Sequence, residues 1–320
     1  MSIENKYGQP YKQDSQKNIT NPADYFEGVI DVPVYDWLFT LDQIQRESPS
    51  RRLTNIKQRI GFTEESQKRA KGIVYLFACS KQLRLSRCVA LTASILFHRF
   101  YMKRDFTNYH YFEIAATCLF IASKSEECRR KLSDVVKVCA SIALTGRVSD
   151  KVTEESKIYW KWKDVIVNLE ELVLEVLCFD VTPLNPYKIC FGALNLSEDD
   201  DQQNDEGADK IFSTSINYLE LLSRLPLSIL FPVDTICGLG FVLSCASSKT
   251  KLSKYSFDQF EINLDEVWKC YCTTIKLAQN LEKLRQPFPI LAHIPKLSHE
   301  SLIKICGSVD AGGERETTGI

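Results

Sequence analysis

Several features that mark other classes of protein are absent from this sequence. No apolar run approaches the roughly 18 residues that a membrane-spanning helix requires. The polar start, "MSIENKYGQPYKQDSQ", lacks the apolar core of a signal peptide. An excess of one charge is also missing, because 40 Lys and Arg residues stand against 41 Asp and Glu residues. We therefore expect neither a membrane protein nor a secreted one, and the charge balance gives no general reason to expect nucleic-acid binding.

Cysteine is plentiful, with 12 residues, but spacings that serve metal binding are absent. There is no C-x-x-C pair, and Cys270 and Cys272 are too close together for a usual zinc pair. Others, such as Cys118, Cys178 and Cys190, fall within apolar helical patterns, where a free cysteine behaves as a small hydrophobic side chain. The four histidines are scattered. The sequence predicts no metal site, and reduced thiols in the cytosol or nucleus.

Signatures of catalysis and of cofactor binding are absent as well. The chain has no phosphate-binding G-x-x-x-x-G-K-[ST], no G-x-G-x-x-G, no G-x-S-x-G and no kinase H-R-D or D-F-G. Gly238 and Gly240 lie inside a helical stripe, where we expect them to permit close helix packing. The pair Glu126 and Glu127 does not form a catalytic dyad, because adjacent residues of a helix point about 100° apart. We expect no cofactor and no enzymatic activity.

Helical periodicity dominates what is present. Apolar residues recur at helical spacing in two successive series, and no convincing strand pair or hairpin signal occurs. Ser86 is expected to cap the second helix, and Asn185-Pro186 to open the first helix of the second series. The Ala-rich stretch 110–124 is the expected central helix, since small residues let neighbouring helices approach closely. The expected helices are 64–81, 86–102, 110–124, 131–145 and 161–178, followed by 186–195, 209–224, 232–247 and 263–285.

These two series predict an all-α fold made of two consecutive domains of about five helices each. Polar, proline-containing residues 1–35 are expected to form a flexible N-terminal extension. The first domain is predicted over 36–181 and the second over 182–290, with a C-terminal tail over 291–320 whose Gly-rich end, "GSVDAGGERETTGI", is expected to be disordered.

The stretch "ASKSEECRRKLSDVV", residues 122–136, places charges directly after the most hydrophobic helix. It can be a solvated helix end, a catalytic carboxylate pair or a polar hot spot on a protein-binding surface, and a solvated end is favoured over catalysis. Basic groups at 50–52, 67–71 and 128–131 are separated by acidic residues. They do not form the continuous basic face that nucleic-acid binding uses, so we do not expect direct nucleic-acid binding.

Three stretches resemble the cyclins, specifically the transcription-type cyclins of the cyclin T and cyclin K group. "WLFTLDQIQRESPSRR" (37–52) is similar to the segment before the first cyclin box. "LFHRFYMKRDF" (96–106) is similar to the end of the second cyclin-box helix, and "AATCLFIASKSEECRRKLSDVVKVC" (115–139) to the third helix and the start of the fourth. The resemblance covers roughly 37–290, and it implies two consecutive five-helix cyclin-box domains.

The resemblance also implies a function. Cyclins are non-catalytic subunits that bind and activate a cyclin-dependent kinase, and this group serves kinases that phosphorylate the C-terminal domain of RNA polymerase II in the nucleus to promote transcription elongation. By motif, Lys124 and Glu170 correspond to the main polar contacts with the kinase. Phe179 matches an aromatic residue that packs against the kinase, and Leu174 is expected to add hydrophobic contact.

The sequence also bears on substrate docking, on a third subunit and on a different class of protein. Tyr75 and Ala78 stand where cell-cycle cyclins carry the Trp and Glu that follow Arg69 in their substrate-docking motif, so no such docking is expected. "YWKWKD" (159–164) is either core packing or a surface for a third subunit. A different-class alternative is a two-cyclin-fold general transcription factor that binds DNA and polymerase, although the zinc ribbon and basic face usual in those proteins are not visible.

Overall fold

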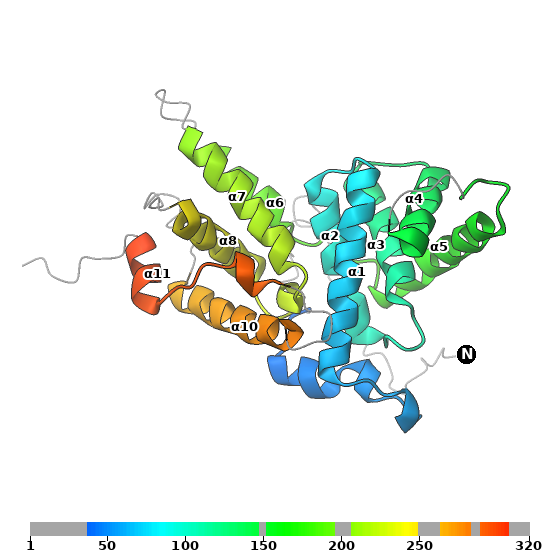
Figure 1. The fold of residues 1–320 in the computed structure, drawn as a ribbon, viewed down its shortest axis with the longest axis horizontal. Coiled ribbons are helices and arrows are strands. Elements are labelled where there is room, and N and C mark those ends of the chain that lie inside the picture. Colours follow the sequence, from blue (N-terminus) through cyan, green and yellow to red (C-terminus); the bar gives the residue numbers. More distant parts are fainter. Residues whose placement is uncertain (1–36, 147–151, 196–205, 249–262, 283–288, 307–320) are drawn as a thin grey trace, which may run out of the picture. The chain divides into compact units, whose positions relative to one another are not determined.

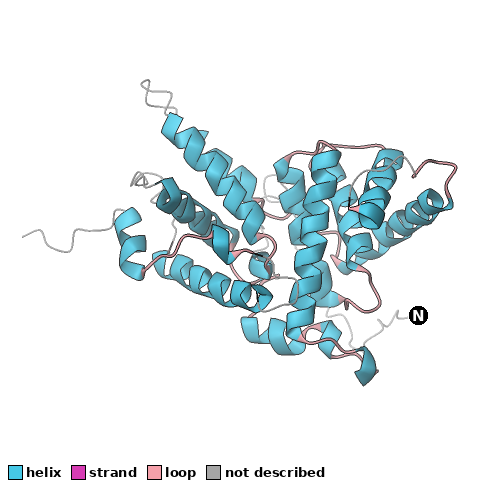
Figure 2. Ribbon diagram, viewed as in Figure 1, coloured by secondary structure: helices cyan, strands magenta, loops and turns pink. Residues whose placement is uncertain are grey.

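The computed structural model describes residues 37–146, 152–195, 206–248, 263–282 and 289–306. Within these ranges every regular element is helical, which confirms the predicted all-α class (Figure 2). The predicted extension 1–35, most of the acidic stretch 197–209 and the Gly-rich end 307–320 lie outside them. The α-helices are α1 (Phe62–Gln82), α2 (Arg87–Lys103), α3 (Tyr111–Ser125), α4 (Leu132–Thr145), α5 (Lys157–Val176), α6 (Pro186–Asn195), α7 (Glu206–Leu222), α8 (Val233–Ser248), α10 (Leu264–Glu282) and α11 (His299–Ile305).

Helix α3 is the centre of the first half, as its composition predicts. It packs against α1, α2, α4 and α5 (Figure 1). Its small residues Ala115, Ala116 and Ala122 are fully buried, so these neighbours can approach its backbone closely. The predicted start signals are also confirmed. Ser86 Oγ accepts a hydrogen bond from the Val89 amide at the start of α2, and this satisfies a donor that the helix itself cannot pair.

The second half has its own hydrophobic core around α8, which packs against α7 and α10. A Cβ atom at Gly240 would lie 3.3 Å from Leu219 Cγ, so this glycine allows α7 and α8 to pack closely, as predicted. Asn185 Oδ1 accepts from the Tyr187 amide at 2.8 Å and begins α6 in the expected manner. The core continues past the predicted boundary at 290, because the apolar side chain of Leu302 in α11 is fully buried in it.

The two cores meet through α1 and α2, whose residues Ala70 and Leu91 are buried in the second core and not the first. The segment before α1 also contacts the second half, since the Phe39 amide donates to the Ile229 carbonyl at 2.8 Å. Residues 37–58 therefore belong to the packed body of the protein. They contain the short helical turns η2 (Gln43–Glu47), η3 (Pro49–Arg51) and η4 (Ile56–Gln58).

Candidate functional site

The structure brings together two of the four residues singled out for kinase binding. Lys124 lies in the last turn of α3 and Glu170 lies in α5, the helix packed beside it. Lys124 Nζ is 2.6 Å from Glu170 Oε1 and also lies 4.0 Å from the ring centroid of Phe120. The Lys124 side chain is 44% exposed and that of Glu170 is 22% exposed. The pair is thus accessible at the surface, and the ring of Phe120 restricts where the ammonium group can go.

Leu174 and Phe179 follow on the same helix and at its end. Leu174 is one turn after Glu170, on the same face of α5, and packs partly against the first core. The helix ends at Val176, two residues earlier than predicted, and the Phe179 amide donates back to the Leu174 carbonyl at 2.9 Å. Phe179 itself is 68% exposed, which makes it one of the most exposed large hydrophobic residues among those described.

The chain at Cys178 and Phe179 is in the left-handed backbone region, with φ of 52° and 61°. The bonds from Cys178 to Glu175 and from Phe179 to Leu174 form a Schellman-type helix end, in which glycine usually takes the left-handed position. Cys178 takes it here, after the end of α5, and is exposed, so the prediction that it lies within an apolar helical pattern was wrong. Each non-glycine residue in this region costs on the order of 1–3 kcal/mol.

Three residues next to this turn had no role assigned from the sequence. Asp180 Oδ2 accepts hydrogen bonds from Trp37 Nε1 and from the Arg99 guanidinium, each at 2.8 Å. Trp37 precedes η2, Arg99 lies in α2 and Asp180 follows Phe179. Arg99 and Asp180 are visible in the sequence as charged residues, but no sequence motif indicates that they contact each other.

Glu126 is not a solvated helix end. Its carboxylate accepts from Thr92 Oγ1 at 2.6 Å and from Cys88 Sγ, and it pairs with Lys188 of α6 at 2.7 Å. Its side chain is 7% exposed. Burial alone would raise the pKa of Glu126, but the hydrogen bonds from Lys188, Thr92 and Cys88 outweigh it and lower the pKa. Glu126 therefore joins the end of α3 to the second half of the molecule.

The basic turn after it also differs from the expected solvated turn at one position. Arg130 donates from Nε to the Leu83 carbonyl at 2.9 Å and from its terminal nitrogen to the Arg84 carbonyl at 2.7 Å. It thereby binds the carbonyl groups of the two residues that directly follow α1. Arg129 and Lys131 are exposed, as expected.

The aromatic run at 159–164 contains both core and surface residues, which are the two alternatives that the sequence left open. Tyr159 is buried and Trp162 packs partly against the first core. Trp160 is half-exposed, and its ring nitrogen donates to the Glu154 carbonyl at 2.7 Å. Core packing accounts for two of the three rings, and the third, Trp160, lies half-exposed at the surface.

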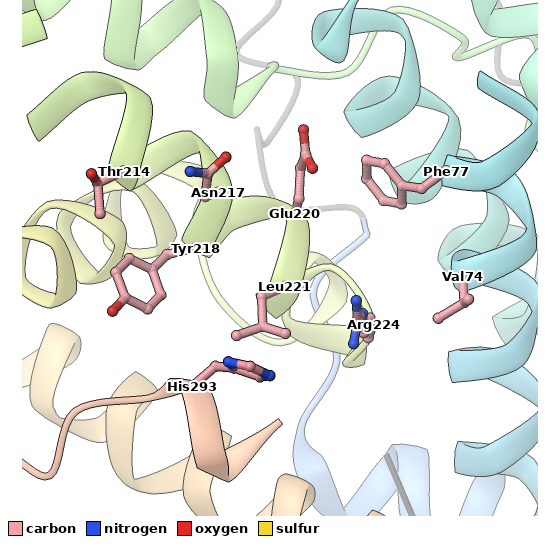
Figure 3. Close-up of a pocket in the computed structure, with 9 residues that line it drawn as sticks. All are labelled: Val74, Phe77, Thr214, Asn217, Tyr218, Glu220, Leu221, Arg224 and His293. Carbon is pink, nitrogen blue, oxygen red and sulfur yellow. The ribbon is translucent and has the colours of Figure 1, made fainter. Parts of the chain in front are cut away.

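A groove of about 410 Å³ lies between α1 and α7 (Figure 3). Glu220 on its wall pairs with Arg87 of α2 at 3.1 Å. Burial raises the pKa of Glu220, and the charges of Arg87 and Arg224 oppose that rise. None of the four residues predicted to contact a kinase lines this groove. Its lining residues are Val74, Phe77, Thr214, Asn217, Tyr218, Glu220, Leu221, Arg224 and His293.

The described part of the chain holds no group of three or more His, Cys, Asp or Glu residues placed to bind a metal ion. All twelve cysteines lie in described residues and are present as thiols. Among the described helices, none combines the length and the apolar character needed to span a bilayer.

Comparison with known proteins gives the following relationships. The family model for the cyclin N-terminal domain matches residues 36–182. Cyclin pch1 of Schizosaccharomyces pombe is 30% identical over 237 residues, which cover 72% of this chain and 67% of that protein. Cyclin-T1 of Mus musculus is 32% identical over 151 residues, which cover 47% of this chain but 20% of the mouse protein. The chain thus spans a minor part of that longer relative.

Solved structures agree in fold. A chain of the yeast RNA polymerase II CTD kinase CTDK-1 complex superposes with a TM-score of 0.58 at 16% identity, covering 87% of this chain and 92% of that one. A chain of the CAK complex of Chaetomium thermophilum superposes with a TM-score of 0.55 at 15% identity, covering 85% and 80%. At these identities the likeness concerns the fold alone.

Proposed function

Because this chain belongs to the cyclin family, we propose that it is the regulatory subunit of a cyclin-dependent kinase that phosphorylates the C-terminal domain of RNA polymerase II. The relatives support this reading, since one of them is named Cyclin-T1 and the sequence motifs of this chain resemble the cyclin T group. The CTDK-1 complex, whose chain shares this fold, is itself a kinase of that domain. Such a subunit acts in the nucleus and promotes transcription elongation through its kinase.

The chain supplies no catalytic group in this proposal, and its role is to hold the kinase in its active form. A protein kinase requires an ion pair between a strand lysine and a glutamate of a mobile helix, and the position of that helix controls activity. A rigid helical surface can bias this position without touching the substrate.

The observation that carries the proposal is the surface at the end of α3 and α5. It presents the exposed Lys124–Glu170 pair and the protruding ring of Phe179, with Leu174 one turn after Glu170. An exposed aromatic side chain and charged groups that can exchange partners are typical components of an interaction hot spot. In the free chain Lys124 and Glu170 satisfy each other, and on binding each would turn to a group of the kinase.

We also propose that the two cores correspond to two cyclin-box domains, 36–181 and 182–290. The separate apolar clusters of the two halves support this division. The segment 291–306 would then pack onto the second domain, as the burial of Leu302 and Cys306 indicates.

To test this, the tagged chain is expressed in the organism that it comes from and purified, and a co-purifying cyclin-dependent kinase is identified. The activity of that kinase is then assayed on a peptide of polymerase C-terminal repeats. The chain alone should be inactive. Lys124→Ala/Glu170→Ala should weaken kinase activation by about tenfold or more, because truncation leaves the partner groups unpaired. The matched control is Lys137→Ala/Glu154→Ala, which breaks another exposed pair, 2.8 Å long, between α4 and the segment before α5.

Equal activation by both double variants would show that the Lys124 surface is not the kinase-binding site. Absence of any kinase, together with tight binding of duplex DNA at physiological salt, would instead identify a general transcription factor of the two-cyclin-fold type.

A further inference from the structure

Phe179 combines a large exposed side chain with a backbone conformation that few residues adopt. Phe179 and the preceding Cys178 both have positive φ, and neither is glycine. Conformations of this kind persist when the surrounding structure holds them, and they concentrate at functional sites. Hydrogen bonds to the Leu174 and Glu175 carbonyls fix the turn on its helix side. On its other side the Asp180 amide donates to the Leu177 carbonyl and the Val181 amide donates to the Phe179 carbonyl, each at 3.0 Å. All of these bonds are local, so an anchor to the rest of the fold must come from a side chain.

Asp180, the next residue, supplies that anchor. Its Oδ2 atom accepts from Trp37 Nε1 and from the Arg99 guanidinium, each at 2.8 Å. The bond from Arg99 joins two charges, and such bonds are stronger than bonds between neutral groups. Two separate chain segments, the start of the packed body and α2, therefore hold the residue that directly follows Phe179.

The anchor is sheltered from water on the arginine side. The Arg99 side chain is 13% exposed, and its guanidinium carbon lies 5.1 Å from the centre of the Trp37 ring. Burial lowers the pKa of Arg99, and the charge of Asp180 opposes this. Lys103 also lies over the Trp37 ring, at 5.5 Å. The tryptophan thus packs on two cations of α2 while its ring nitrogen binds Asp180, and we call Trp37, Arg99 and Asp180 the Asp180 anchor.

We propose that the Asp180 anchor positions Phe179 for contact with the kinase, which gives the segment around Trp37 an indirect part in kinase binding. This inference rests on the proposed function. A ring that is already fixed in its bound position loses less conformational freedom on binding, and so contributes more to affinity. The three anchor residues act through Phe179 and need no contact with the kinase themselves.

The test is a double-mutant cycle on affinity for the recombinant catalytic subunit of the kinase that co-purifies with the wild-type chain. Phe179→Ala should weaken binding by roughly thirtyfold, as for a hot spot. Asp180→Ala should weaken it by roughly tenfold in the wild-type background and by less than about twofold when Phe179 is already alanine. Trp37→Phe, which removes the ring N–H and keeps an aromatic ring, should give a smaller loss that likewise disappears in the Phe179→Ala background.

A second measurement needs no kinase. Hydrogen exchange of the Cys178 and Phe179 amides should speed up in Asp180→Ala, because the turn opens when its anchor is lost. Asp42→Ala is the matched control, since it breaks another aspartate–arginine pair, with Arg46 at 2.7 Å, and should leave these two amides unchanged.

The outcomes distinguish a failure of the proposed kinase-binding surface from a failure of the proposed positioning role. If Phe179→Ala binds the kinase as well as the wild type does, the proposed binding surface is wrong and the inference falls with it. If Phe179→Ala weakens binding but the effect of Asp180→Ala is unchanged in that background, the surface stands and the positioning role is overturned. Unchanged amide exchange in Asp180→Ala overturns it as well.

Discussion

Two ion pairs of this protein have nearly the same length and opposite settings. Arg69 and Glu65 of α1 are 2.8 Å apart, and Lys124 and Glu170 are 2.6 Å apart. Both side chains of the first pair are 1% exposed, against 44% and 22% in the second. Length alone does not separate a structural pair from one that a partner can rearrange. The surroundings do, because a buried pair has no water to replace a lost partner.

The buried pair is part of a closed network. Glu65 also accepts from Arg51, and Arg69 donates to the carbonyl groups of His98 and Tyr101 in α2. Burial lowers the pKa of Arg69, and the neighbouring Glu65 carboxylate opposes this. The network ties η3, α1 and α2 together. Arg69, the position that matches a docking residue of cell-cycle cyclins, therefore holds the fold together from the inside.

The largest effect is expected from opening this network. Glu65→Ala leaves the Arg69 guanidinium buried without its carboxylate, so it should lower the free energy of unfolding by about 3–5 kcal/mol. Chemical denaturation of the purified chain measures this. Glu65→Leu/Arg69→Met removes both charges and should recover much of the loss. A single variant that loses less than about 1 kcal/mol would show that the pair is not as buried as its side chains indicate.

His98 extends the same network and makes it sensitive to acid. Its Nε2 atom lies 2.8 Å from the Ser223 carbonyl, across the two halves of the molecule. Burial and the charge of Arg69 lower the pKa of His98 to about 3, although the hydrogen bond to Ser223 opposes them. In the unfolded chain its pKa is about 6.5. Between these values the unfolded state binds the proton and the folded state does not, so stability must fall as the pH falls.

The expected loss attributable to His98 is on the order of 3 kcal/mol between pH 6.5 and pH 4. Denaturation of the wild type and of His98→Gln across this range measures it, because glutamine can still donate to the Ser223 carbonyl but does not titrate. The variant should lose less stability on acidification than the wild type does. Identical pH profiles would mean that the histidine becomes protonated in the folded state at ordinary acid pH.

The helices and their order were predictable, since local patterns decide them. Apolar spacing located α1 to α5 within a few residues, and Ser86 and Asn185 marked helix starts because a cap acts on its own next turn. The pairing of Lys124 with Glu170 is consistent with the motif resemblance, but periodicity alone left Lys124 as one of several charges at a helix end.

The polar contacts between distant segments were not predictable in the same way. Glu126 looked like its neighbour Glu127, yet Lys188 and Thr92 hold the first inside and the second points outward. No local signal distinguishes them, because the difference comes from helices that meet only in the folded chain. The same holds for Asp180 and Trp37, which are far apart in sequence and share a hydrogen bond.

The smallest effect on stability is expected at the exposed pair, and it completes the contrast with Glu65. Lys124→Ala should change the free energy of unfolding by less than about 1 kcal/mol, because water can solvate Glu170 when its partner is gone. The same variant should still weaken kinase binding, since an exposed ion pair that breaks at little cost in free energy leaves its groups available to a partner. Parallel denaturation and kinase-binding measurements on Lys124→Ala and Glu65→Ala test this. If Lys124→Ala lowered the free energy of unfolding as much as Glu65→Ala does, the Lys124–Glu170 pair would be structural. The main support for a binding site on this surface would then be removed.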